Sequence, residues 1–157
     1  DMPTTVLAAG RSVPLTIDRP FYTHELEHKD VFGVVAQRVA SAEIRRLLMF
    51  SDIGQNTDRI RRYNALRSSH WNKYPPVASP GVMLLGGTSA LRRLLENEQE
   101  IAQLSRERGF SVLEPESCPV GRLLRRLSGT RTVVSVEGSQ LAHGLYAVQP
   151  GGTIFTL

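Results

Sequence analysis

The chain has 157 residues, about the size of one domain, and 41% of them are hydrophobic, which is enough to bury a core. Charged residues make up 22% and the formal net charge is only +4, so the composition is not that of a disordered segment. Aromatic residues reach only 6%, and the arginine pairs fall on expected helices, which argues against a nucleic-acid surface. No apolar run has membrane-spanning length.

Cysteine usage bears on the compartment. Cys118 is the single cysteine, so no internal disulfide can form, and this fits a reducing environment. We expect a cytoplasmic protein, with a peripheral position at the inner membrane as a variant of that location. The chain starts at Asp1 without a methionine and ends on an apolar, strand-like run at residues 153–157. Both ends suggest a piece of a longer protein.

The first 30 residues are predicted to be an N-terminal extension or hairpin. Residues 4–9 and 12–17 would pair as strands across the turn residues between them. His24 and His28 are four residues apart and could chelate a metal from one helix, but no third ligand is spaced convincingly nearby. We therefore predict no metal site and interpret them as surface or core histidines.

Residues 31–157 are predicted to form one domain. Its first part has a helix at residues 31–42 and a strand at residues 44–50. Thr57 is then expected to cap a helix that carries Ile60, Tyr63 and Leu66 at helical spacing. The prolines between residues 75 and 80 break the chain into a surface connection.

From residue 82 onward, strand-like and helix-like segments alternate to the C-terminus. The predicted strands are residues 82–85, 110–113, 132–136 and 153–157. The predicted helices are residues 90–108, which would end at the C′ glycine Gly109, then 120–127 and 140–148. This alternation implies right-handed crossovers and an α/β fold with an open, mostly parallel sheet and helices on both faces.

A parallel sheet brings its strand-to-helix loops to one edge, where ligands of open α/β sheets bind. We therefore expect the loops at residues 51–56, 86–89, 114–117 and 137–139 to be neighbours. The Gly-Gly-Thr-Ser run at residues 86–89 offers backbone donors at Gly87 and a hydroxyl at Thr88 for a phosphate. It matches neither the Walker nor the dinucleotide fingerprint, and a plain turn is an equally good interpretation.

The loop after the strand at residues 132–136 is the strongest candidate ligand site. Gly138 permits close backbone approach, and Ser139 is expected to cap the next helix, whose positive end suits an anion. Glu137 and His143 lie at the rim of this loop. They could act as a general base, as hydrogen-bonding groups for a ligand, or as a structural pair, and we favour a functional role.

The predicted helix at residues 90–108 carries a second group of polar residues. Arg93 and Asn97 are four residues apart and share one flank. Glu98 falls on the apolar face, close to Leu91 on the helical wheel. A buried pair with an arginine and a contact with a ligand explain that position equally well.

These motifs together resemble the C-terminal part of family sixty-one glycosyltransferases, which include bacterial capsular-polysaccharide enzymes. The resemblance covers about the last 95 residues. It rests on residues 93–98 (Arg-Leu-Leu-Glu-Asn-Glu), Gly109-Phe110, Pro115-Glu116, residues 136–143 (Val-Glu-Gly-Ser-Gln-Leu-Ala-His) and Pro150-Gly151, with residues 63–67 preceding them. Residues 1–55 show no resemblance to a family.

The resemblance implies one Rossmann-like lobe of a two-lobed GT-B-like fold. It also implies inverting, metal-independent transfer of a sugar from a nucleotide-sugar donor to a saccharide acceptor in surface or capsular polysaccharide synthesis, with no cofactor and with a second lobe missing. Arg93 and Asn97 would then approach the diphosphate. Two positions depart from the family pattern: Glu137 stands where a histidine is common, and Ser89 where an arginine is usual.

By the same resemblance, Gly138, Ser139 and His143 would line the donor site. Glu137 is our candidate catalytic base, because it is the carboxylate expected at the strand end beside the glycine turn. The alternative is a noncatalytic α/β module that binds a nucleotide or only a protein partner.

Overall fold

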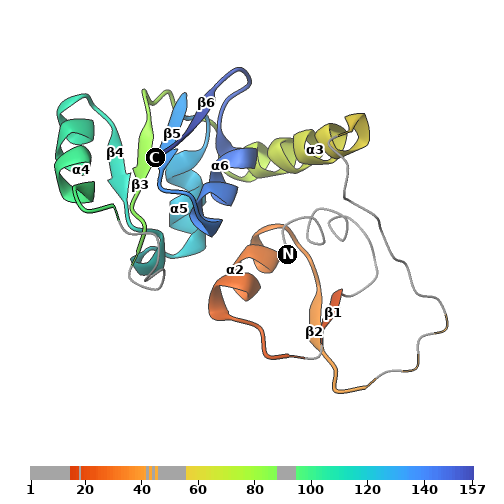
Figure 1. Cartoon of the computed structure of the whole chain (residues 1–157). Helices are drawn as coiled ribbons and strands as arrows, with labels where there is room; N and C mark the ends of the chain where they lie inside the picture. Colours follow the sequence, from red (N-terminus) through yellow and green to blue (C-terminus); the bar gives the residue numbers. More distant parts are fainter. Residues whose placement is uncertain (1–14, 18, 42, 44, 46–55, 88–94) are drawn as a thin grey trace. The chain divides into compact units, whose positions relative to one another are not determined.

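The computed structural model describes residues 15–17, 19–41, 43, 45, 56–87 and 95–157, drawn in colour in Figure 1. The chain divides into two compact units, residues 1–66 and residues 67–157. The division that the sequence suggests, after residue 30, lies inside the first of these units.

The first unit contains a small parallel β-α-β arrangement. Strand β1 (Leu15–Ile17) pairs in parallel with β2 (Ala36–Arg38), and helix α2 (Thr23–Val31) lies between them in the sequence. At the start of α2, the Glu25 carboxylate accepts the Tyr22 N–H at 2.9 Å and pairs with Arg19 at 2.6 Å. This pairing lowers the pKa of Glu25 to about 2.

The predicted helix at residues 31–42 is wrong. Helix α2 ends at Val31, and the chain then turns at Gly33, whose φ of +63° is the left-handed conformation that commonly ends a helix. The strand β2 follows. Of the predicted N-terminal hairpin, Leu15–Ile17 is a strand, but residues 4–9 lie outside the described residues. So do the predicted strand at residues 44–50, apart from Arg45, and the loop at residues 51–55.

Helix α3 (Thr57–Lys73) confirms the predicted helix after residue 56 and ends just before the prolines. Its N-cap differs from the prediction, however. The Asn56 Oδ1 accepts the N–H of Arg59 at 2.9 Å, and Thr57 is already the first helical residue. Asn56 is the better cap because its side-chain oxygen reaches the third amide of the helix.

The second unit is built on a four-stranded sheet in the order β4-β3-β5-β6 (Figure 1). All three neighbouring pairs are parallel. The strands are β3 (Val82–Leu84), β4 (Ser111–Leu113), β5 (Thr132–Ser135) and β6 (Thr153–Thr156). The predicted α/β, Rossmann-like parallel sheet is therefore confirmed.

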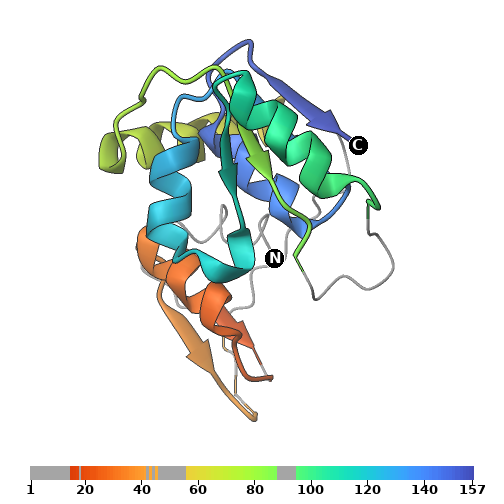
Figure 2. The ribbon, with the colours of Figure 1, turned by 90° about the vertical axis from the view of Figure 1, so that its left-hand side faces the viewer.

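Helices cover both faces of this sheet. They are α4 (Glu98–Glu107), α5 (Val120–Leu127) and α6 (Ala142–Ala147). On one face the Ser105 hydroxyl of α4 lies 3.5 Å from the Met83 sulfur of β3. On the other face Gly144 of α6 packs on Val133 of β5, which pairs with Val82 and so points away from Met83. Figure 2 views the sheet from the side of α4, with α6 behind it.

Helix α4 is shorter than predicted. Its C-terminal end is as expected, because Gly109 has φ +79° just beyond the last turn. At the other end the helix begins only at Glu98, and residues 95–97 form a turn that closes with the Glu98 N–H donating to the Leu95 carbonyl at 3.1 Å. Residues 88–94 lie outside the described residues. The first residue of the helix is thus Glu98, whose side chain contacts the segment after β3.

The core lies between the sheet and helices α5 and α6. Leu123, Leu124 and Leu127 of α5 are fully buried, as their spacing predicts, and so are Val82, Met83 and Leu84 of β3. The end of α3 joins this core: the Trp71 Nε1 donates to the Ala147 carbonyl at 3.3 Å. His70, one residue earlier, is 1% exposed.

Candidate functional site

The candidate site lies at the carboxyl edge of the four-stranded sheet. Because all strands are parallel, the segments that follow β3, β4 and β5 leave the sheet at this edge. The buried Ser135 hydroxyl donates to the Leu84 carbonyl at 2.8 Å, which links the last residues of β5 and β3. The Leu85 N–H donates to the Leu113 carbonyl at 2.9 Å and does the same for β3 and β4. The three segments therefore start from a rigid base.

Glu98 reaches back from the start of α4 to the segment after β3. The backbone N–H of Gly86 donates to the Glu98 Oε1 at 2.7 Å, a short, charge-assisted hydrogen bond. This contact explains why a carboxylate occurs on the apolar side of the helical pattern. The sequence left two explanations open, a pair with an arginine and a contact with a ligand. The partner that the structure gives Glu98 is instead the backbone amide of Gly86 at the sheet edge.

Glu116 covers the next residue of the same segment. Gly87 has φ +67°, and a Cβ at this position would lie 2.5 Å from the Glu116 Oε1. Glu116 belongs to the short 3₁₀ helix η1 (Pro115–Ser117) after β4, which is anchored by the buried side chain of Pro115. Gly87 is therefore required both for its backbone conformation and for the approach of this carboxylate.

The segment after β5 differs in detail from the prediction. Ser139 does not cap a helix: it is the first residue of the 3₁₀ helix η2 (Ser139–Leu141), Gly138 holds the N-cap position, and α6 starts only at Ala142. Gly138 is extended, with φ 175°, so its conformation is open to any residue. The Gln140 amide instead folds over Gly138 and donates to the Val136 carbonyl at 3.2 Å.

The predicted binding residues fall into three groups. The first group is Gly87, which lies at the edge with Glu98 and Glu116. A Cβ on Gly86 would lie 3.9 Å from the Val136 side chain, so the segments after β3 and β5 are neighbours. Glu137, Ser139 and Asn97 are exposed, Gly138 is half-exposed, and His143 is 7% exposed on the first turn of α6. Thr88 and Arg93 lie outside the described residues.

The chemistry of this edge is dominated by carboxylates. Glu98, Glu116 and Glu137 all belong to the segments described above, and such groups can accept hydrogen bonds from sugar hydroxyls or take up a proton. The Gly86 amide, which would otherwise face an anion, is occupied by Glu98. A phosphate at this edge would need cations to offset the carboxylates, and the nearest arginines in sequence, Arg92 and Arg93, are not among the described residues.

Glu98 and Glu116 were not selected as site residues from the sequence. Each had a local signal: Glu98 interrupts an apolar helix face, and Glu116 lies in a strand-end segment of a parallel sheet. What the sequence could not supply is the direction of each side chain. Both carboxylates point at the Gly86-Gly87 backbone.

Within the described part of the chain, no helix is both long and apolar enough to cross a membrane. Among curated proteins no relative matches the chain. The family model described as Glycosyltransferase 61 matches residues 12–155, so the similarity is not confined to the last 95 residues and includes most of the first unit. With nearly the whole length matched, the chain belongs to the glycosyltransferase 61 family.

Proposed function

We propose that this chain binds a nucleotide-sugar donor at the carboxyl edge of the second unit's sheet and takes part in inverting, metal-independent sugar transfer. The acceptor is a saccharide in surface or capsular polysaccharide synthesis. The observation that carries the proposal is the meeting of the Gly86-Gly87 segment with the segment after β5, in a member of a glycosyltransferase family. The carboxyl edge of a parallel sheet is where open α/β folds bind nucleotides.

In this arrangement the residues have distinct roles. Arg93 and Asn97 approach the diphosphate, and Gly87, Thr88, Gly138, Ser139 and His143 line the donor. Glu137 is exposed at the end of β5 and is the proposed base for the acceptor hydroxyl. Glu98 holds the Gly86 amide at 2.7 Å, so a phosphate group that uses this amide must displace a carboxylate.

The second unit is one lobe of a GT-B-like enzyme under this proposal. An enzyme of that architecture works in the cleft between two lobes, each about 100–200 residues long. The second unit, with residues 67–157, provides a single parallel sheet for donor binding. We therefore expect weak donor binding and little transfer by this chain alone, because a further lobe would position the acceptor.

Donor binding is tested by titrating the whole chain with UDP, GDP and CMP in a calorimeter. Gly87→Ala should weaken binding of the preferred nucleotide at least tenfold, because the added Cβ meets Glu116. Gly109→Ala is the matched control: it also replaces a glycine of positive φ, but its nearest neighbour is Pro80 at 3.7 Å and it lies outside the proposed site. If no nucleotide binds below millimolar concentration, the donor-site assignment is wrong.

The Glu98→Gln variant tests whether the Glu98 carboxylate competes with the diphosphate or helps to shape the site. The amide oxygen keeps the acceptor for the Gly86 N–H while the negative charge is lost, so diphosphate affinity should rise severalfold. A drop in affinity would mean that the carboxylate charge helps to shape the site.

Transfer is tested with a panel of nucleotide-sugars and saccharide acceptors, with product detected by mass spectrometry. Multiple turnover that is abolished by Glu137→Gln would support Glu137 as the base and refute the expectation that this chain alone transfers little sugar. Turnover that survives Glu137→Gln would refute both. Nucleotide binding without transfer under every condition fits the single lobe, and it equally fits the alternative of a noncatalytic nucleotide-binding module.

A further inference from the structure

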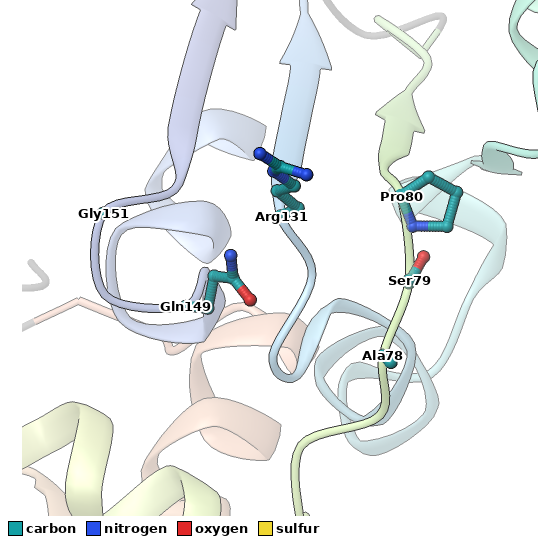
Figure 3. A pocket seen from close by; sticks show the side chains of 6 residues that line it. All are labelled: Ala78, Ser79, Pro80, Arg131, Gln149 and Gly151. Carbon is teal, nitrogen blue, oxygen red and sulfur yellow. The ribbon is translucent and has the colours of Figure 1, made fainter.

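A pocket lies at the opposite edge of the sheet from the proposed donor site. It is an open surface pocket of about 460 Å³. Figure 3 shows the residues that line it at the starts of β3, β5 and β6. Its lining residues come from the segments that lead into these strands: Ala78, Ser79, Pro80, Arg131, Gln149 and Gly151. Its volume falls within the range of about 300–1,000 Å³ of small-molecule sites.

The walls of the pocket are held by backbone hydrogen bonds. The Arg131 N–H donates to the Ser79 carbonyl at 3.1 Å, and the Arg131 carbonyl accepts the Thr153 N–H at 2.9 Å. The Gly152 N–H donates to the Gln149 carbonyl at 2.9 Å. A Cβ on Gly152 would lie 2.7 Å from the Arg131 carbonyl oxygen, so the segments are tightly packed. The pocket is therefore pre-formed by backbone, and the groups left for a ligand are side chains.

Arg131 provides the charge of the pocket. Its side chain stands between Gln149 on one side and Ser79 and Pro80 on the other (Figure 3). Arg131 is exposed, and among the described residues it makes no ion pair. The guanidinium fork with a neighbouring amide matches a planar carboxylate, which it can bind through two parallel hydrogen bonds.

The surroundings select against a more highly charged anion. Helices α5 and α6 both end at this edge, at Leu127 and Ala147, and helix C-terminal ends carry partial negative charge. A single arginine can offset one negative charge there but not a diphosphate. Ala78 and Pro80 add apolar surface, which suits the C–H face of a sugar ring.

We propose that this pocket binds a carboxylate-bearing sugar residue, such as a uronic acid, of the saccharide that the enzyme extends or has made. This inference rests on the proposed function, because it identifies the acceptor or product of the proposed sugar transfer as an acidic saccharide. The pocket lies at the amino edge of the strands, so it holds the saccharide away from the donor site. Its ligand chemistry can be tested without any nucleotide.

The test is an NMR titration of the full chain with glucuronate, glucose and inorganic phosphate, following the backbone amides of residues 79, 131, 149 and 152. Glucuronate should shift these amides, with at least tenfold weaker effects from glucose and phosphate. Arg131→Ala should weaken glucuronate binding at least tenfold, Arg131→Lys should retain part of it, and Arg106→Ala, which removes an exposed arginine from α4, should leave it unchanged.

Equal binding of glucose and glucuronate would overturn the assignment of a carboxylate, and stronger binding of phosphate would overturn the choice of a sugar acid. Unchanged glucuronate binding in Arg131→Ala would overturn the site itself. Nucleotide titrations of Arg131→Ala keep the two proposals apart. The nucleotide affinity of Arg131→Ala should equal that of the unmodified chain. If the unmodified chain binds glucuronate but no nucleotide, the donor site is refuted and the assignment of this pocket is not affected.

Discussion

His70 should make the second unit sensitive to mild acid. Its ring is 1% exposed in α3, and its centroid lies 5.4 Å from that of the Tyr74 ring. Burial disfavours the charged imidazolium and lowers the pKa of His70 from 6.5 to about 4, although the nearby Leu124 backbone partly opposes this shift. In the unfolded chain the pKa returns to its ordinary value, so the two states bind protons differently between these limits.

The sign and size of the effect follow from this difference. Above pH 6.5 the histidine is neutral in both states, and stability is full. As the pH falls toward 4, the unfolded state takes up the proton first, so the free energy of unfolding drops through this window. The difference between a pKa of 6.5 in the unfolded chain and about 4 in the folded chain corresponds to about 3 kcal/mol of the free energy of unfolding, and this loss is complete once the folded state is also protonated.

Urea unfolding followed by tryptophan fluorescence measures this loss. Trp71 is the only tryptophan and hydrogen-bonds to the Ala147 carbonyl in the same unit. Between pH 7 and pH 4, His70→Leu should lose about 3 kcal/mol less stability than the unmodified chain. Val133→Ala is the control, since it opens the core at a fully buried site without a titrating group and should keep the full pH dependence. Equal losses in the unmodified chain and in His70→Leu would refute the reasoning.

Two further predictions concern backbone and capping. Asn56→Ala should cost about 1 kcal/mol of stability in chemical denaturation, because the Asn56 side chain accepts the Arg59 amide. Thr57→Ala should cost at most a few tenths of a kcal/mol. The reverse order of these losses would identify Thr57 as the cap. Gly152→Ala should cost about 1–3 kcal/mol, because its Cβ meets the backbone oxygens of Arg131 and Gln149. Gly151→Ala, with φ +74° but open space around it, should cost about 1 kcal/mol, and a larger loss there than at Gly152 would contradict the packing argument.

The sequence by itself was sufficient for the elements whose signals are local. The helix Val120–Leu127 occurs with the predicted bounds because its leucines form an apolar stripe and Gly129, with φ +74°, follows it. The strands of the second unit occur within one or two residues of their predicted ends. Their parallel arrangement followed from the alternation of strands and helices, and it correctly indicated one common edge.

Only the tertiary structure decided the features that depend on distant partners. The segment at residues 31–42 contains a strand rather than a helix because β2 finds β1, about twenty residues earlier, as its hydrogen-bonding neighbour. Helix α4 starts at Glu98, and the Glu98 carboxylate accepts the N–H of Gly86, twelve residues earlier in the chain. The Arg131 pocket unites three segments that the chain keeps far apart. Hydrophobic periodicity indicates which face of an element is buried, but it carries no information on which distant backbone group a polar side chain will contact. Contacts of that kind determine the structure of both edges of this sheet.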